Sequence, residues 1–261
     1  MKYILALALT VIFTTFAQAK LVEETIEYKD GEAMLEGYLV YDDEAGTPQP
    51  GVLVFHEWWG LNDYIKSRAR DIASLGYVAF APDVYGKGVR PADAKAAGAE
   101  AGKYMKDRKL LRSRGAAALD TLKKNKRVDP EKIAAIGYCF GGAAALELAR
   151  SGAPVAATAT FHGVLNTPTP EDAAKIKGSV LVLHGSEDRS VKPAEVQSFQ
   201  DAMNKAGVDW QLVSYGKAVH GFTNQENGTN PSKGVAYDEK ADKRSWEALK
   251  DFLGEKLGSG R

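Results

Sequence analysis

Short uninterrupted apolar runs alternate along this chain with segments whose apolar residues recur at helical spacing. The runs lie at residues 52–55, 77–82, 133–137, 155–161, 179–185 and 210–215. Runs of this kind, apolar on both faces and rich in Val and Ile, are typical of buried strands in a parallel sheet. Two further segments, 26–28 and 35–41, flank Asp30-Gly31 and predict an N-terminal β-hairpin.

Helical spacing of apolar residues is found at 64–74, 116–122, 141–150, 194–206 and 238–257. In the last of these segments five large side chains fall on one stripe: Trp246, Leu249, Phe252, Leu253 and Leu257. The alternation of strand and helix predicts an α/β fold with a mainly parallel sheet and helices on both faces. In such a sheet, the loops at the carboxyl ends of the strands form the ligand-binding sites.

The first 19 residues have a different pattern. Lys2 precedes an apolar run over 3–17, and residues 17–19 (AQA) have the small-x-small pattern of a signal-peptidase site. The run is short for a membrane anchor, which needs about 20 apolar residues. We favour a cleaved signal peptide over an uncleaved anchor or a buried first helix. The expectation is a periplasmic or secreted protein whose residues 20–261 form one domain.

The charge and the cysteine count restrict the partners. Without residues 1–19, the chain has 33 basic and 34 acidic residues and a net charge of −1. This balance predicts no nucleic-acid partner and, after cleavage of the signal, no membrane partner. With a single cysteine no internal disulfide can form. We expect a monomer that acts on a small molecule.

The single cysteine, Cys139, lies where a predicted strand passes into a predicted helix. A nucleophile on such a sharp turn needs small neighbours, and Gly137, Gly141 and Gly142 provide them. The helix N-terminus favours thiolate over thiol, and the N–H of Phe140 is expected to stabilise the oxyanion of a tetrahedral intermediate. The alternative is an inert buried cysteine, because free Cys is among the most buried residue types.

An acid and a histidine follow Cys139 in the chain order typical of α/β-hydrolase triads. Asp188 and His220 each lie in the loop after a predicted strand. The sequence therefore predicts His220 as the proton partner of the thiol and Asp188 as the group that orients the imidazole. Glu187 is the competing acid. Two other histidines are interpreted as polar strand-end residues beside the site: His162 and His184.

Four motifs together resemble the dienelactone hydrolase family, also called carboxymethylenebutenolidases: HEWWG at 56–60, GYCFGG at 137–142, HGSEDRSV at 184–191 and HGF at 220–222. The resemblance covers essentially all of residues 20–261. It implies an α/β-hydrolase fold and a cysteine hydrolase of enol-lactones and esters, with no metal and no organic cofactor. The triad that it implies consists of Cys139, Asp188 and His220.

The resemblance also implies a role for Glu57, which pairs with the cysteine and helps to form the thiolate as substrate binds. A thiol that stays protonated at rest is protected from oxidation. The N–H of Trp58 is the expected second oxyanion donor. The alternatives are an ordinary exposed carboxylate at Glu57 and core aromatics at Trp58 and Trp59. We expect at least one of the two tryptophans to wall the pocket.

The chain departs from the family at two places. The resemblance implies two arginines that hold the substrate carboxylate, and here Lys87 and Asn224 stand in their places. Lysine can meet a carboxylate as a point charge but lacks the bidentate fork of arginine, and asparagine has no charge. Arg90 is a candidate to substitute spatially. The chemistry therefore carries over, whereas the dienelactone substrate is left open. Five residues are expected to bind substrate: Trp59, Tyr85, Lys87, Phe222 and Asn224.

The predicted function is hydrolysis of a small ester or enol-lactone through an acyl-cysteine intermediate. One alternative is a general carboxylesterase that acts on cell-envelope or other exported substrates. Another is a non-catalytic binding protein of the same fold. Redox sensing through the lone thiol ranks last, because the chain has no resolving cysteine.

Overall fold

The computed structural model describes residues 20–258. The predicted signal peptide, residues 1–19, lies outside the described residues. The strands are β1 (Leu21–Asp30), β2 (Ala33–Asp42), β3 (Gln49–Phe55), β4 (Val78–Ala81), β5 (Val128–Tyr138), β6 (Ala157–Phe161), β7 (Ser179–Gly185) and β8 (Trp210–Tyr215). The α-helices are α1 (Asp63–Ser74), α2 (Ala94–Lys106), α3 (Arg108–Lys123), α4 (Phe140–Arg150), α5 (Pro193–Ala206) and α6 (Glu239–Leu257). Short 3₁₀ helices are η1 (Pro170–Lys175), η2 (Gln225–Asn227) and η3 (Pro231–Lys233).

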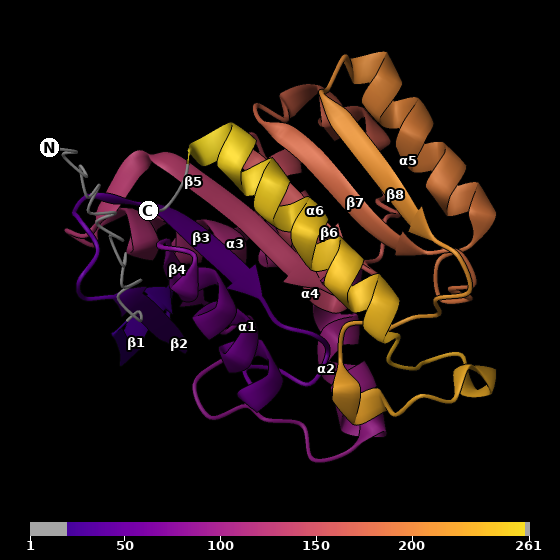
Figure 1. Ribbon diagram of the computed structural model, residues 1–261, viewed down its shortest axis with the longest axis horizontal. Helices are drawn as coiled ribbons and strands as arrows, with labels where there is room; N and C mark the ends of the chain where they lie inside the picture. Colours follow the sequence, from indigo (N-terminus) through magenta and orange to yellow (C-terminus); the bar gives the residue numbers. More distant parts are fainter. Residues whose placement is uncertain (1–19, 259–261) are drawn as a thin grey trace, which may run out of the picture.

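One sheet contains all the named strands, in the order β1-β2-β4-β3-β5-β6-β7-β8 (Figure 1). β1 and β2 form the predicted antiparallel hairpin, and β2 also pairs antiparallel with β4. The remaining neighbours pair in parallel. The predicted mainly parallel α/β fold with an N-terminal hairpin is confirmed.

Helices cover both faces of the sheet. On one face, Ile65 and Ile72 of α1 and Leu249 and Leu253 of α6 pack in one core with alternate strand residues such as Ile136. Figure 1 shows α6 running along the sheet on this face. The other face carries α2, α3 and α4, and α5 joins it by packing in a cluster with α4. Each large apolar side chain buried in these layers contributes about 1.5–3 kcal/mol.

The pattern of apolar residues missed α2 and placed the start of α3 too late, at residue 116 instead of Arg108. α2 buries only Ala97, Ala101 and Tyr104, so it lacks the stripe of large apolar residues that marks a helix in a sequence. The strand over 210–215 is also not buried on both faces. β8 lies at the edge of the sheet, and only Tyr215 is buried.

The parallel strands end at one edge of the sheet. The cysteine, an acid and two of the histidines singled out in the sequence follow strand ends at this edge. His56 comes after β3, Cys139 after β5, His162 after β6 and Asp188 after β7. His220 lies in the long connection that follows β8. The topology therefore gathers at one edge residues that lie far apart in the sequence. Within residues 20–258, no helix is long and apolar enough to cross a membrane.

Candidate active site

Cys139 occupies a sharp turn between β5 and α4, with φ 54° and ψ −115°. This conformation is rare for a residue with a side chain, and such strain concentrates at functional sites. The turn needs glycines on both sides: a Cβ on Gly137 would overlap the carbonyl of Gly141, and a Cβ on Gly141 would overlap the carbonyl of Phe55. The N–H of Cys139 donates to the carbonyl of Phe161 at 3.0 Å. The turn thus holds a half-buried thiol at the positive end of a helix.

His220 lies between Asp188 and Cys139. Its Nδ1 is 2.8 Å from Asp188 Oδ2, and its Nε2 is 3.0 Å from Cys139 Sγ. The second carboxylate oxygen of Asp188 accepts the N–H of Ser190 at 2.8 Å. Glu187 is exposed, so Asp188 is the acid that reaches the imidazole. The structure therefore brings together the acid, the histidine and the thiol that the sequence singled out.

Burial and charge act in opposite directions on the imidazole. Burial lowers the pKa of His220, but the negative charge of Cys139 and the hydrogen bond with Asp188 outweigh it, so the pKa lies well above its ordinary value. Each of these charged partners favours the protonated ring. The site therefore favours the imidazolium form of His220.

Glu57 is buried beside the thiol, with 6% of its surface exposed. Its Oε2 accepts a hydrogen bond from Asn224 Nδ2 at 2.9 Å. The orientation of that amide is set by its other end, because Asn224 Oδ1 accepts the N–H of Glu226 at 3.0 Å. Burial raises the pKa of Glu57, and the smaller opposing effects of Asn224 and of the His220 charge do not cancel the rise. Glu57 is thus no ordinary exposed carboxylate.

The loop that carries Trp58 is held by two buried side chains. His56 Nε2 accepts the N–H of Val84 at 3.2 Å, so Nδ1 carries the proton and donates to the carbonyl of Glu57 at 2.6 Å. The hydroxyl of Tyr85 donates to the carbonyl of Trp58 at 2.9 Å. These bonds fix the backbone of the HEWWG loop next to the thiol.

The two predicted oxyanion donors flank the thiol. Phe140 is the first residue of α4, so its N–H has no acceptor inside the helix. Trp58 lines the same cavity as Cys139. Stabilisation of a developing oxyanion requires backbone N–H groups that are held in fixed positions.

A buried polar network behind the imidazole was not anticipated from the sequence. The ring of His162 packs edge-on against that of His220, with centroids 5.2 Å apart. His162 Nε2 lies 2.7 Å from Thr223 Oγ1, which in turn lies 2.6 Å from the hydroxyl of Tyr64. Burial holds the pKa of His162 well below its ordinary value, so this ring stays neutral beside His220. His162 therefore packs against the ring of His220 as a neutral group and contacts the loop that carries it through Thr223.

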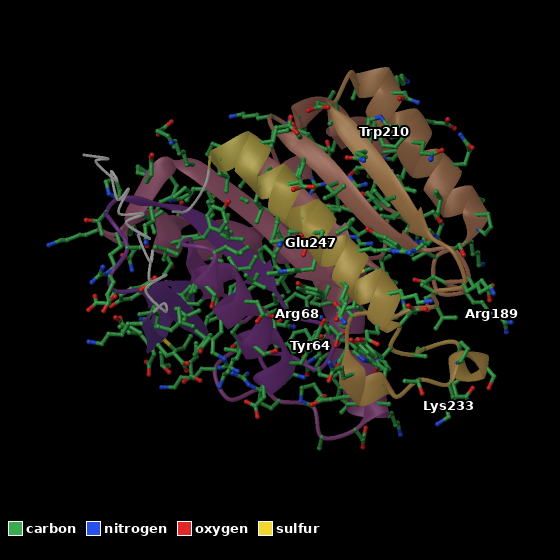
Figure 2. The ribbon with its side chains drawn as sticks, viewed as in Figure 1. Tyr64, Arg68, Arg189, Trp210, Lys233 and Glu247 are labelled. Carbon is green, nitrogen blue, oxygen red and sulfur yellow. The ribbon has the colours of Figure 1, made fainter. Side chains whose placement is uncertain are left out.

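Arg68 anchors the loop that carries His220. Its guanidinium donates to the carbonyl of Thr223 at 2.5 Å and pairs with Asp242 of α6 at 2.6 Å. Figure 2 shows Arg68 and Tyr64 together on α1, near the N-terminal end of α6. No local motif marks these residues, because α1, α6 and the loop after β8 meet only in the folded chain.

The cavity above the thiol has a volume of about 410 Å³. Its lining consists of Glu57, Trp58, Trp59, Cys139, Val164, Ser190, His220, Gly221, Asn227 and Val235. Both tryptophans wall the pocket, with ring centroids 5.3 Å apart. Half of the lining was not among the predicted site residues: Val164, Ser190, Gly221, Asn227 and Val235.

Four of the residues expected to bind substrate do not line this cavity. Lys87 lies apart from it and pairs with Glu27 of β1 at 2.5 Å. Asn224 is buried, and its side-chain amide donates a hydrogen bond to the carboxyl of Glu57. Tyr85 supports the Trp58 loop from the core, and Phe222 is fully buried. Matching of motifs could not show where these side chains point.

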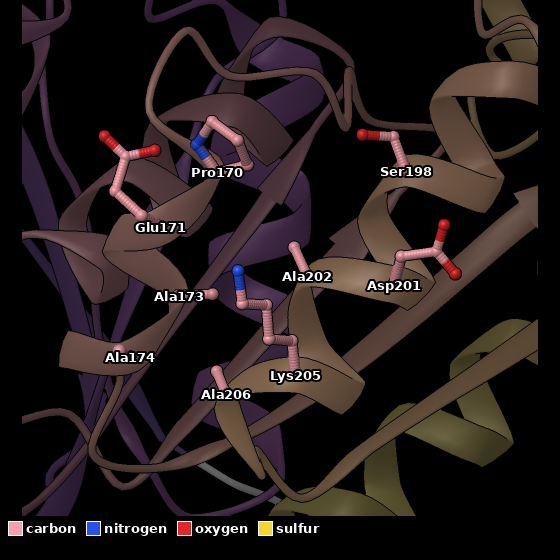
Figure 3. A pocket seen from close by; sticks show the side chains of 9 residues that line it. All are labelled: Pro170, Glu171, Ala173, Ala174, Ser198, Asp201, Ala202, Lys205 and Ala206. Carbon is pink, nitrogen blue, oxygen red and sulfur yellow. The ribbon is translucent and has the colours of Figure 1, made fainter.

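A second cavity, of about 480 Å³, lies between η1 and α5 (Figure 3) and shares no lining residue with the cavity above the thiol. Its lining includes Glu171, Asp201 and Lys205 but no cysteine or histidine. Within residues 20–258, no group of three or more His, Cys, Asp or Glu side chains is arranged to hold a metal ion.

The sheet order and the turn that carries Cys139 define a fold of the α/β-hydrolase type. The chain belongs to the dienelactone hydrolase family, whose sequence pattern matches residues 35–257, and it is a hydrolase of that family. It is 30% identical over 239 residues to a protein of Aquifex aeolicus named "Putative carboxymethylenebutenolidase", covering 88% of this chain and 97% of that protein.

Two solved structures are similar over 91% of this chain and 99% of their own. The structure named m3DLH has 40% sequence identity and a TM-score of 0.88. A dienelactone hydrolase-like promiscuous phosphotriesterase from metagenomic libraries has 41% identity and a TM-score of 0.86.

Proposed function

We propose that this protein cleaves a small carboxylic ester or enol-lactone through an acyl-cysteine intermediate on Cys139. The observation that supports it is the unbroken chain of contacts from Asp188 through His220 to the thiol, at 2.8 and 3.0 Å, on a strained strand-to-helix turn. Activated nucleophiles need this combination of an adjacent base and a group that orients it. Membership of the dienelactone hydrolase family supports the same reaction class.

In the first half-reaction, the Cys139 thiolate attacks the carbonyl carbon and forms a C–S bond. The N–H groups of Phe140 and Trp58 stabilise the oxyanion. The C–O bond to the alcohol then breaks, and the leaving oxygen takes a proton from the imidazolium of His220. In the second half-reaction, His220 removes a proton from water, which attacks the thioester. The C–S bond breaks, the carboxylic acid is released and the Cys139–His220 pair is restored.

Glu57 is proposed to accept the thiol proton as substrate binds. Its buried carboxyl lies in the same cavity as Cys139, and burial raises its pKa, which favours uptake of a proton by this group. Asn224 keeps the carboxyl in position for this exchange through its hydrogen bond.

Turnover of 4-nitrophenyl acetate by wild type and by Cys139→Ala tests the proposal. We expect the variant to lose activity while its circular dichroism spectrum stays unchanged. Intact-mass spectrometry of wild type during turnover should show one added acetyl group, and the variant should show none. Undiminished hydrolysis by Cys139→Ala would overturn the proposal.

A second activity, toward neutral phosphotriesters, is also proposed. The relative described as a promiscuous phosphotriesterase is 41% identical to this chain, and the cavity around Cys139 holds no arginine or lysine in its lining, as suits an uncharged substrate. The test is hydrolysis of paraoxon, which should release 4-nitrophenol with wild type and not with Cys139→Ala. The absence of release with wild type would refute this second activity.

A further inference from the structure

The lining of the cavity around Cys139 contains an acidic side chain and no lysine or arginine. Its ten lining residues include no lysine and no arginine, whereas Glu57 contributes a carboxyl that is 6% exposed. The two tryptophans, Val164 and Val235 supply apolar surface, and polar groups without charge come from Ser190 and Asn227. The one cationic group that can form in the lining is His220, whose two ring nitrogens already face Asp188 and Cys139.

Four basic side chains on elements close to the site do not line the cavity. Arg68 is bound to Asp242 and to the carbonyl of Thr223, below the His220 loop. Lys87 pairs with Glu27 on β1. Arg189 and Lys233 are neighbours of lining residues in the sequence, but both side chains are exposed, where an ion pair is worth no more than about 1 kcal/mol.

From this distribution of charge we infer that the site selects substrates that carry no negative charge on the part inside the cavity. The inference rests on the proposed ester hydrolysis and names its substrate class as neutral esters and lactones. A carboxylate that enters would leave water, meet no cation and lie in the same cavity as the carboxyl of Glu57. Burial without a partner is costly, and so is the approach of two like charges.

A matched pair of substrates tests the inference: the 4-nitrophenyl ester of monomethyl adipate and the 4-nitrophenyl ester of adipic acid. They differ in one methyl group and one charge, and the six-carbon chain is too long for fast self-cleavage by its own carboxylate. We expect kcat/KM for the neutral ester to exceed that for the anion about 100-fold, which corresponds to like-charge repulsion of a few kcal/mol.

Two substitutions at one position supply the control. Val235 is 37% exposed at the cavity wall, so a longer side chain can be accommodated there. Val235→Lys should reduce the preference for the neutral ester about tenfold, which corresponds to about 1.4 kcal/mol. Val235→Met adds similar length without charge and should keep the preference of wild type.

The outcomes separate the inference from the proposed function. If wild type cleaves the anionic ester as fast as the neutral one, and Cys139→Ala cleaves neither, the inference is wrong and the reaction stands. A preference that changes equally in Val235→Lys and Val235→Met also refutes the inference, because shape rather than charge would then decide. Turnover of neither ester by wild type, or turnover that survives in Cys139→Ala, refutes the proposed function and the inference with it.

Discussion

Replacing Glu57 by glutamine is expected to make the protein more stable at neutral pH, although it removes a group proposed to act in the reaction. The substitution keeps the shape of the side chain and an oxygen that accepts the hydrogen bond from Asn224 Nδ2, now 2.9 Å long. It removes only the ionisation of a carboxyl that is 6% exposed. A site that holds a destabilised group for function is a common source of such gains in stability.

The pH dependence follows from the raised pKa of Glu57, which burial causes. The folded protein holds this proton more tightly than the unfolded chain does, so unfolding releases a proton and the stability of wild type falls as the pH rises. The loss begins near the ordinary carboxyl pKa of 4.5 and is complete above the raised value. An ionised buried carboxyl with a single side-chain donor lowers the free energy of unfolding by about 1–3 kcal/mol. In a chain of this size, each kcal/mol of unfolding free energy that the variant gains raises its Tm by about 2–4 °C.

The assay is thermal unfolding of wild type and Glu57→Gln from pH 4 to pH 8. The two Tm values should agree at pH 4 and diverge above pH 4.5, with the variant higher. Glu187→Gln is the matched control, because Glu187 is exposed and its removal should change the stability by less than about 0.5 kcal/mol at any pH. A Tm difference that is constant across the pH range, or a variant less stable than wild type at pH 8, would refute the reasoning.

Three other substitutions test the packing and the proposed chemistry. Gly142→Ala should destabilise the fold by about 1–3 kcal/mol in chemical denaturation, because the new Cβ would overlap the hydroxyl of Thr160. Asp188→Asn should lower kcat for 4-nitrophenyl acetate about 10⁴-fold while leaving Tm within a few degrees, since it disturbs the imidazole that contacts it at 2.8 Å. Arg68→Met should cost about 3–5 kcal/mol of unfolding free energy, because it leaves a largely buried Asp242 without its partner, and Arg68→Lys should recover part of that loss.

Much of the fold could be predicted from the sequence because the strands are buried and continuous. The runs at 52–55, 133–137 and 179–185 lie inside β3, β5 and β7, where both faces are covered and apolar residues therefore follow one another. α2 escaped prediction because two alanines and one tyrosine make up its buried face, and so few large apolar residues produce no clear periodic signal.

The site was partly predictable for a topological reason. A parallel sheet places the ends of its strands at one edge, so the order of Cys139, Asp188 and His220 was enough to expect them close together. The cavity wall was not predictable, since Val164, Asn227 and Val235 come from loops whose course depends on tertiary contacts. Lys87 shows the same limit, because a position in a motif does not determine the direction of a side chain.

One turn of the chain, residues 220–224, supplies both the imidazole beside the thiol and the amide that holds Glu57. The guanidinium of Arg68 donates to this turn at the carbonyl of Thr223. The turn therefore connects the positions of His220 and of the Glu57 carboxyl. Because Arg68 and Asn224 both make hydrogen bonds at this turn, the effects of changes at the two positions should be non-additive.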